Sequence, residues 1–492
     1  MNLVVRLPIA ALLAAAACSP SAPPATKPDT GLDIPEQWSA TNVGTAETVS
    51  ERWWEDFEAT SLSAAVDQAL NFNTDMIVAA ARVDQAAAQA RIAGADMKPQ
   101  LSGGLSGLRA QRNFVGFPIP GGEDSVLTTV SNNFGVSVDL SWEIDLWGRL
   151  SAQAREGLAS FQASQADYAA VRLSIAGQTA KAWFAVAEAQ LQVDLAERTV
   201  ASLTRSADQV RDRFERGIRP PLDLRLALAQ LYGAEAAIEA RKRQLDFASR
   251  QLEVLLGLYP GRELAFPEEL IATPASIPPG LPPELVSRRP DIVAAERRLM
   301  ASEQRLKVAR ASLYPRLSLT ASGGTSTAEL GDLVKGDFSV WSLAGNLLAP
   351  LFSGGRLRAG VDLAAAGVDE TVAGYIGTAL RAYSEVEVTL AADGYLANRA
   401  GSLEQTTVQS RAAERLAMDR YRNGLESFIT VLDSQRRTFD AESAWIAGRR
   451  ERLDNRVDLY LALGGGFDPT AIYDSESQTT TTPAENPAER NR

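Results

Sequence analysis

The chain has 492 residues, with 49 basic and 61 acidic side chains, one cysteine and no histidine. A net charge of −12 argues against nucleic-acid binding, which depends on clustered cationic side chains. The absence of histidine removes the commonest general base and a favoured metal ligand, and a single cysteine leaves no disulfide framework, so we expect neither an enzyme nor a metal or other cofactor.

A secretory signal peptide is predicted at residues 1–17. Its positive start includes Arg6, and the apolar run that follows is about 11 residues long, too short to span a bilayer as a helix. The residues before Cys18 resemble a bacterial lipoprotein box, which implies a covalent lipid on Cys18, and Ser19 fits delivery to the outer membrane. Ala15 stands where leucine is usual. An ordinary signal peptide with an incidental cysteine is the alternative.

Residues 18–60 are expected to link this anchored end to the folded body. Residues 19–30 are rich in proline, alanine and serine, which is typical of a flexible tether. Trp53 and Trp54 follow, and two interpretations are open for them. They pack onto the main body, or they form an exposed anchor.

A helix, a strand and a loop are predicted next. The helix runs from about residue 62 to residue 97, because alanine recurs through it and Pro99 follows. The strand is Leu101–Ala110. Proline and glycine at several positions indicate a loop over residues 111–128.

The stretch from Phe134 to Gly217 organises the rest of the chain. Residues 134–146 alternate between apolar and polar side chains, which predicts a strand with one apolar and one polar face. The polar face carries Asp139, Ser141, Glu143 and Asp145. Residues 150–214 contain no proline and are rich in good helix formers. They predict one helix of roughly 65 residues, near 100 Å long at about 1.5 Å per residue.

The second half of the chain repeats the first. A shift of 216 positions superposes the early parts of the two halves, and a shift of 207 positions superposes the later parts. Matched pairs include Pro99 with Pro315, Leu101 with Leu317, Arg149 with Arg356, and Gly217 with Gly424. The shifts differ because the first half has the longer loop between its strands, and insertions accumulate in exposed loops. The sequence therefore predicts a tandem duplication.

Each half reads helix, strand, loop, strand, long helix, turn and helix. The remaining predicted helices are 222–256, 284–313, 356–423 and 425–463, and the strands of the second half are 316–323 and 338–347. The predicted organisation is a signal peptide at 1–17, a linker at 18–60, a first repeat at 61–257 with its β-hairpin at 100–147, a proline-rich linker at 258–283, a second repeat at 284–466 with its β-hairpin at 315–348, and a disordered tail at 467–492.

Four strands of about ten residues have the length of tilted membrane strands. Four strands cannot close a barrel, and open edges are not tolerated in lipid, so closure requires several copies of the chain. Two copies give eight strands and three give twelve, and only larger barrels leave room for a lumen. A trimer is therefore expected, with the polar strand face lining the lumen. The alternative is a strand of a soluble β-sandwich, with one face exposed to solvent.

The turns at the far ends of the two long helices are the candidate functional site. They contain Gly217 and Arg219 in the first half and Gly424 and Glu426 in the second. After the second turn, Ile429, Asp433 and Arg436 share roughly one helix face by their spacing. Rings of such residues from several copies form a charged, closable aperture. A solvated, salt-bridged helix end is an equally good interpretation.

Five motifs stand out in the chain: Arg289-Pro290-Asp291-Ile292, Tyr314-Pro315-Arg316-Leu317, the run from Trp142 to Arg149, the run from Pro350 to Arg356, and Arg420-Tyr421-Arg422-Asn423-Gly424 with Leu432-Asp433. These motifs resemble those of TolC-like outer-membrane efflux proteins, in the lipoprotein branch that serves resistance–nodulation–division pumps. The resemblance covers nearly all of the mature chain.

This resemblance implies a mainly α-helical fold with a membrane β-barrel portion. The family forms a homotrimeric tunnel, with a twelve-stranded barrel in the outer membrane and a long α-helical barrel in the periplasm. A periplasmic adaptor contacts it at the helix turns and an inner-membrane pump supplies substrate, while the tunnel catalyses nothing. The periplasmic gate of the family maps onto Asp223, Ile429, Asp433 and Arg436. This sequence has Glu426 and Thr430 where some members carry Arg and Asp.

Three other functions are open. A structural envelope lipoprotein would bridge outer membrane and periplasm through coiled coils without conducting. A protein-secretion channel would share the architecture but export polypeptides. An envelope enzyme would need a cleft of convergent polar groups, which the sequence does not indicate.

Overall fold

The computed structural model describes residues 34–35, 37–39, 49–114, 127–263, 269–275, 285 and 288–473. Its elements in chain order are the 3₁₀ turn η2 (Trp53–Phe57), α2 (Thr60–Phe72), α3 (Thr74–Ala95), β1 (Gln100–Phe114), β2 (Leu127–Ile144), α4 (Arg149–Glu215), α5 (Pro221–Leu255), α7 (Pro290–Ala311), β3 (Arg316–Thr327), the 3₁₀ turns η3 (Leu330–Asp332) and η4 (Gly336–Phe338), β4 (Ser339–Leu348), α8 (Arg356–Arg422), α9 (Phe428–Ala462) and α10 (Thr470–Tyr473). None of the helices in these ranges combines the length and the hydropathy that crossing a membrane requires.

The helices of the two halves match in length. The long helices α4 and α8 have 67 residues each, α5 and α9 have 35 each, and α3 and α7 have 22 each. Both long helices agree with the predicted ranges 150–214 and 356–423, and a glycine lies two residues beyond the end of each helix. The predicted order of helix, strand, strand, long helix and helix is therefore present twice.

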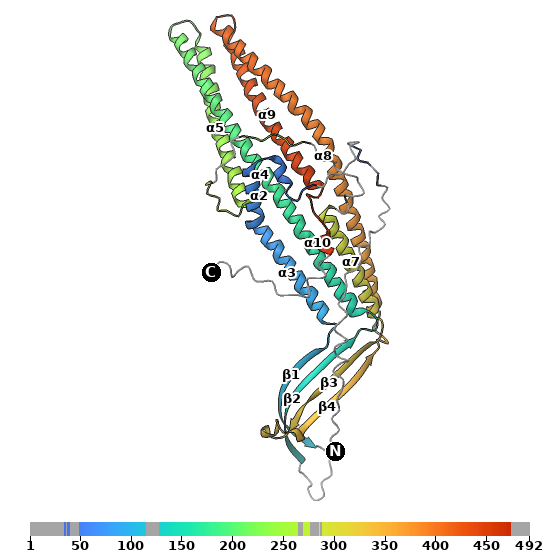
Figure 1. Cartoon of the computed structure of the whole chain (residues 1–492). Helices are drawn as coiled ribbons and strands as arrows, with labels where there is room; N and C mark the ends of the chain where they lie inside the picture. Colours follow the sequence, from blue (N-terminus) through green and yellow to red (C-terminus); the bar gives the residue numbers. More distant parts are fainter. Residues whose placement is uncertain are drawn as a thin grey trace. The chain divides into compact units, whose positions relative to one another are not determined.

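The chain divides into two compact units, and the divisions fall inside α3, α4, α7 and α8. The first unit contains residues 84–163 and 296–373. Its centre is one antiparallel sheet in the order β1-β2-β3-β4 (Figure 1). Polar residues face polar residues across β2 and β3, as Asp139 faces Ser322 and Glu143 faces Ser318. The predicted polar strand face therefore continues onto the neighbouring strand.

The strands differ from the predicted ones at their ends. The hydrogen-bonded ladder of β1 and β2 extends to the pair Phe114 and Leu127, so both strands reach into the predicted loop, and residues 115–126 lie outside the described residues. Asp145, predicted on the polar strand face, lies after β2. Its carboxylate accepts hydrogen bonds from the backbone N–H groups of Leu150 and Ser151 at 3.0 and 2.9 Å. The prediction that Asp145 lies on the polar strand face is wrong, because its side chain caps the first turn of α4.

The second unit contains residues 164–295 and 374–473, together with the segment that leads up to residue 83. Two antiparallel helical hairpins, α4 with α5 and α8 with α9, form most of it (Figure 1). Its largest core cluster includes Leu62 of α2, Phe184 of α4, Leu252 of α5 and Tyr460 of α9. The long helices are alanine-rich, and this lets their axes approach closely.

Trp53 and Trp54 are buried in this core rather than exposed. The Trp53 ring stacks on Tyr460 with centroids 5.0 Å apart, and the Tyr460 hydroxyl donates to Asp56 at 2.6 Å. The interpretation that this segment packs onto the main body is confirmed, and the exposed-anchor alternative is wrong. Burying a large apolar side chain contributes about 1.5–3 kcal/mol, which favours this docking.

Three predicted boundaries are wrong for identifiable reasons. The helix predicted over 62–97 is two helices, because Asn73 is extended and its side chain accepts from the backbone N–H of Asp75 at 2.8 Å. The helix predicted over 284–313 is interrupted at Arg289, because a residue before proline disfavours helix; Leu285 and Arg288 are helical, and α7 begins after the break at Pro290. Residues 470–473 of the predicted disordered tail form α10, since Ile472 is buried. Cys18, the signal peptide and residues 474–492 lie outside the described residues.

Candidate functional site at the helix turns

Both long helices end in the same backbone turn. Gly217 and Gly424 have φ of 72° and 75°, a left-handed conformation that glycine adopts without steric cost. The N–H of Gly217 donates to the carbonyl of Phe214 at 2.9 Å, and the N–H of Ile218 donates to that of Arg213 at 2.8 Å. Gly424 and Leu425 repeat this pattern with Tyr421 and Arg420 at 3.0 and 2.8 Å. These bonds satisfy the last helical carbonyls and reverse the chain.

The return helices begin in different ways. Pro221 occupies the first position of α5, where its missing N–H costs nothing. At the second turn the Ser427 hydroxyl accepts from the backbone N–H of Thr430 at 3.4 Å, which caps α9. Different residues therefore start the return helix in each half.

The Tyr421 ring joins the two turns. It is buried at the end of α8, with the guanidinium of Arg219 over it at 4.5 Å and that of Arg213 at 5.3 Å. Arg213 also donates to the backbone carbonyl of Arg422 at 3.1 Å. Burial raises the pKa of the Tyr421 phenol, so it stays neutral at physiological pH. Arg219, a predicted turn residue, therefore reaches from the first hairpin to the second.

Glu426 anchors the start of α9. Its carboxylate accepts from the Ser427 backbone N–H and from the Thr430 hydroxyl, both at 3.1 Å, and Arg420 lies 3.7 Å away. The hydrogen bonds from Ser427 and Thr430 hold the pKa of Glu426 below its usual value. Glu426 and Thr430, the two positions that depart from the family pattern, thus contact each other directly.

Asp433 carries a double ion pair one turn further along. Its two carboxylate oxygens bind Arg437 at 2.6 Å and Arg436 at 3.0 Å, and all three side chains are exposed. Hydrogen bonds from Arg437 and Arg436 lower the pKa of Asp433, so it stays ionised well into the acid range. Ile429 is exposed on the preceding turn. The predicted cluster of Ile429, Asp433 and Arg436 is therefore present on α9.

The fourth predicted gate residue lies apart from these three. Asp223 is half-buried in the first turn of α5, close enough to Tyr421 to raise the pKa of its phenol. No hydrogen bond or ion pair joins Asp223 to Asp433 or Arg436 in the part of the chain that the structure describes. Arg436 and Asp440 border a groove of about 250 Å³ between α4, α5 and α9.

The predicted lumen-facing residues lie at the other end of α4. The Asp139 carboxylate accepts from the Ser137 hydroxyl at 2.8 Å, and Ser141 faces Thr320 across the sheet. At the end of β2, both carboxylate oxygens of Glu143 accept from one guanidinium nitrogen of Arg149, at 2.8 and 2.9 Å. This pair ties the end of the strand to the start of α4. The role of the polar face as a channel lining stays a prediction.

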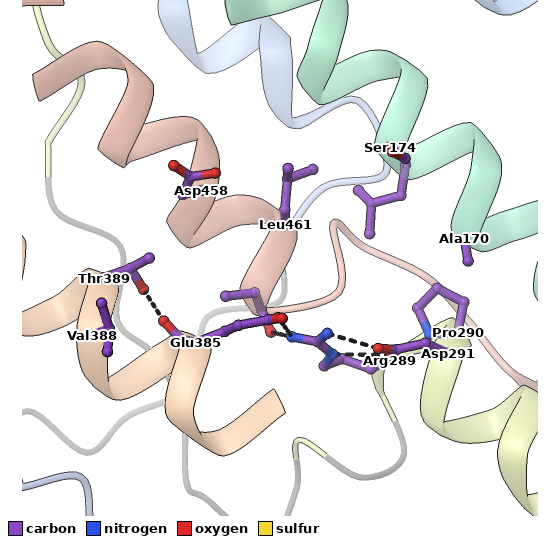
Figure 2. A pocket seen from close by; sticks show the side chains of 12 residues that line it. Ala170, Ser174, Arg289, Pro290, Asp291, Glu385, Val388, Thr389, Asp458 and Leu461 are labelled. Atoms are coloured by element: carbon purple, nitrogen blue, oxygen red, sulfur yellow. Dashed lines mark hydrogen bonds and ion pairs between the residues drawn. The ribbon is translucent and has the colours of Figure 1, made fainter. Parts of the chain in front are cut away.

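A cavity of about 430 Å³ lies between α4, α7, α8 and α9, and Figure 2 shows the side chains around it. The Arg289 guanidinium donates to Glu385 at 2.7 Å, to Asp291 at 2.8 Å and to the backbone carbonyl of Ala462 at 3.1 Å. These partners belong to α8, to α7 and to the end of α9. The Arg289 side chain therefore links α7, α8 and α9 through its hydrogen bonds.

Sequence reasoning missed Tyr421, Arg213 and Arg437 as parts of the site. Arg437 follows Asp433 at the four-residue spacing of helical ion pairs, so that signal was available. Tyr421 and Arg213 act through a contact between turns about 200 residues apart in the sequence, which local spacing does not reveal. No cluster of three or more His, Cys, Asp and Glu side chains able to hold a metal occurs within the described ranges.

Comparison with known proteins identifies the family. The outer membrane efflux protein family matches residues 65–258 and 281–465. The pyoverdine export outer membrane protein OpmQ of Pseudomonas putida is 34% identical over 463 residues, 92% of this chain and 95% of that protein. The outer membrane protein OprJ of Pseudomonas aeruginosa is 34% identical over 420 residues, 84% of this chain and 86% of that protein.

A solved structure shares the fold. The Campylobacter jejuni CmeC outer membrane channel aligns with a TM-score of 0.85 and 26% sequence identity, over 94% of this chain and 99% of that one. The duplicated helix and strand order, the four-stranded sheet and the paired helix turns are therefore those of a TolC-like channel. The chain belongs to the outer membrane efflux protein family.

Proposed function

We propose that three copies of this chain close into one passive exit duct, through which drugs or other small toxic compounds leave the cell. The chain is an outer-membrane component of an efflux system, and the proposal concerns its assembly, its partners and its cargo. One observation carries it: each half supplies an amphipathic β-hairpin joined to a helical hairpin whose long helix has 67 residues. The duct has no catalytic step.

The sheet argues for several copies. Its polar side chains lie on one face of β2 and β3, and its four strands end in two open edges. Three sheets in a ring give twelve strands, with the polar face of Asp139, Ser141 and Glu143 toward water and the apolar face toward lipid. A lipid on Cys18 would hold each copy at the same membrane.

The helix turns argue for partners at the opposite end of the duct. Gly217, Arg219, Gly424 and Glu426 lie at or beside the two reversals, where a periplasmic adaptor would dock. An inner-membrane pump of the resistance–nodulation–division type would deliver substrate. Ile429, Asp433 and Arg436 would form the closed aperture, in which Asp433 is paired with Arg436 and Arg437 of its own helix.

Two alternatives make different predictions. A non-conducting scaffold would need neither a polar strand face nor open sheet edges, and a protein-secretion channel would pass unfolded polypeptide. The relatives named for pyoverdine export and the neighbouring channel structure support a small-molecule duct.

Conductance of the purified full-length protein in planar bilayers tests the proposal. We expect discrete channels, and opening that increases when the adaptor from the same efflux system is added. Protein that inserts stably into the bilayer but never conducts would favour the scaffold. Conductance blocked only by a translocating polypeptide would favour secretion.

A further inference from the structure

The cavity between α4, α7, α8 and α9 has the size and the lining of a small-molecule pocket. Its volume is about 430 Å³, and ligand pockets in proteins typically measure about 300–1,000 Å³. Apolar side chains make up much of its lining, among them Leu173 of α4, Val388 of α8 and Leu461 of α9. Transfer of an apolar group from water to this surface is therefore favourable.

The charges around this cavity are unbalanced. Asp291, Glu385 and Asp458 line it, and Arg289 is the one basic side chain among its described lining residues. The Arg289 guanidinium pairs with both carboxylate oxygens of Asp291, at 3.0 and 2.8 Å. Asp458 is paired with Lys181 of α4. Because Glu385 shares Arg289 with Asp291, it remains as the carboxylate without a cation of its own.

Glu385 also has an oxygen atom available for a ligand. Its Oε2 atom accepts from Arg289 at 2.7 Å, while Oε1 has no hydrogen-bond partner among the described residues. The side chain is 54% exposed, so a ligand can reach it. Figure 2 shows it extending from α8 toward Arg289. An ionised acceptor suits a positively charged N–H donor, because such hydrogen bonds are roughly twice as strong as neutral ones.

Glu385 lies on the side of α8 opposite to the one that residues 37–39 cover. Trp38 contacts Tyr383 with ring centroids 6.2 Å apart, and the Ser39 backbone N–H donates to Glu387 at 2.8 Å. Residues two apart in sequence point about 200° apart around a helix, so Glu385 points away from both. In a ring of helical hairpins a second layer fits only on the outside, because the inside holds the channel. The side of α8 that carries Glu385 would therefore face the lumen.

We propose that this cavity binds organic ammonium ions with an apolar body, and that it lies on the inner wall of the duct. Glu385 is the acceptor for the ammonium group, and Leu173, Val388 and Leu461 contact the apolar body. The proposal rests on the exit duct, because the duct brings such compounds past the cavity. It adds a class of compound for which the duct wall has a binding site of its own.

Affinity should follow the charge of the ligand when its shape is constant. A neutral compound that displaces water from Glu385 leaves the carboxylate without a donor, which costs free energy. An anionic compound adds repulsion from Glu385 and Asp458 to that cost. The expected order of affinity is therefore ammonium, then neutral, then carboxylate.

Three fluorescent probes with the same dansyl body test this order. Dansylcadaverine carries an ammonium group, its N-acetyl derivative is neutral, and dansyl-aminocaproate carries a carboxylate. Each is titrated with the full-length protein in lipid nanodiscs, and the rise in fluorescence anisotropy reports binding. We expect saturable binding of dansylcadaverine and at least about tenfold weaker binding of the other two, because a hydrogen bond to a charged group is lost.

Glu385→Gln tests the acceptor. Glutamine keeps the shape of the side chain and an oxygen for Arg289 but loses the charge, so we expect about tenfold weaker binding of dansylcadaverine and no change for the neutral probe. The matched control is Glu404→Gln, which removes an exposed carboxylate from the same helix outside the cavity. It should keep the affinity of the parent.

Val388→Trp tests the cavity itself. Val388 is 63% exposed in the cavity lining, so tryptophan fits there without disturbing the core and fills the space. It should weaken the binding of the ammonium probe and of the neutral probe alike. The matched control is Val408→Trp, at a position of α8 that is 49% exposed and lies outside the cavity, and it should change neither.

Two results would overturn the site. The first is equal affinity of dansylcadaverine for the parent and for Glu385→Gln, or an equal loss of affinity in Glu404→Gln. The second is equal binding of all three probes by the parent, since affinity would then not depend on charge.

Single-channel currents in planar bilayers separate the site from the duct. Dansylcadaverine should reduce the current of the parent and not that of Glu385→Gln, and an unchanged parent current at saturating probe would overturn the position in the lumen. Channels that conduct but do not bind the probe would remove the site and leave the duct. Selective binding by protein that never conducts would remove the duct and leave the cavity as a binding site.

Discussion

At the scale of single residues, Asp433 is the group whose removal tests the aperture. Asp433→Ala deletes the anion that holds Arg436 and Arg437 at 3.0 and 2.6 Å, and it leaves exposed arginines that repel one another around a ring of copies. We expect increased uptake of bulky antibiotics by cells that express the variant at wild-type levels, with little change in thermal stability because the pair is exposed.

The control for this experiment is Asp246→Ala. Asp246 also pairs within its own helix, with Arg250 at 2.8 Å, but it lies in the later part of α5, far along the chain from either turn. Its removal should leave antibiotic uptake unchanged. Equal uptake by the Asp433 variant, the Asp246 variant and the parent would remove Asp433 from the aperture.

Asp454 gives the protein a pH dependence of stability. Burial raises the pKa of this carboxyl from 3.8 to about 6, against the opposing charges of Arg450 and Lys181. Between about pH 4 and pH 6 the unfolded chain therefore releases this proton while the folded chain keeps it. By linkage, the contribution of Asp454 to stability falls as the pH rises through that window and stays lost above it.

Asp454→Asn should remove this loss of stability at higher pH. A pKa difference of about two units corresponds to on the order of 2–3 kcal/mol, so the variant should be more stable than the parent at pH 7 and similar to it near pH 4. Thermal unfolding followed from pH 4 to pH 8 measures the difference. Asp246→Asn is the control, because Arg250 lowers the pKa of Asp246, so this carboxyl titrates below pH 4 and the difference between that variant and the parent should stay nearly constant over the range. A constant difference between Asp454→Asn and the parent across this range would contradict the assignment.

The residues of the site were predictable where they share one helix. Ile429, Asp433 and Arg436 follow from helical spacing, and Gly217 and Gly424 follow from the glycines that stop the two long helical stretches. The approach of Arg219 to Tyr421 was not predictable, because it depends on two hairpins coming together through the apolar cluster that includes Val210, Leu231 and Val431. Spacing within one segment carries no information about such a contact.

At the scale of secondary-structure elements, the joint between α2 and α5 leaves no room for a side chain at the glycine that ends α5. Gly257 follows α5 with φ of 72°, and a Cβ placed there would lie 2.4 Å from the carbonyl oxygen of Phe72. Gly257→Ala should lower the melting temperature, because both the left-handed backbone and the clash penalise alanine, at a cost of roughly 1–3 kcal/mol.

Gly233→Ala, in the middle of α5, is the matched control. A Cβ at Gly233 has no neighbour within 4 Å, and alanine favours helix over glycine by about 0.5–1 kcal/mol. This variant should be as stable as the parent or slightly more so. If both substitutions changed the melting temperature equally, the joint between Phe72 and Gly257 would not be a constraint on the fold.

Long elements were predictable and short ones were not. A run of more than 60 residues without proline admits few alternatives to one helix, and both long helices agree with the structure within one or two residues. The break at Asn73 and the short α10 depend on single side chains, one that caps a helix and one that is buried. Such local effects compete closely with the preferences of neighbouring residues, so pattern alone does not decide them.

At the scale of the whole molecule, the duplication explains most of the architecture. Equal helix lengths in the two halves and an identical strand register both follow from one repeated unit. Within the described residues the sheet ends at β1 and β4, and its closure by further copies is our proposal, which the sequence supports through the length and alternation of its strands. The number of copies is therefore the central claim, and it follows from closure rather than from any contact within one chain.

Electron microscopy of the detergent-extracted, full-length complex tests this claim most directly. We expect a hollow particle with threefold symmetry and a helical portion near 100 Å long, as one helix of 67 residues requires at about 1.5 Å per residue. A compact monomer, or a rod without an axial channel, would contradict the exit duct and favour the scaffold.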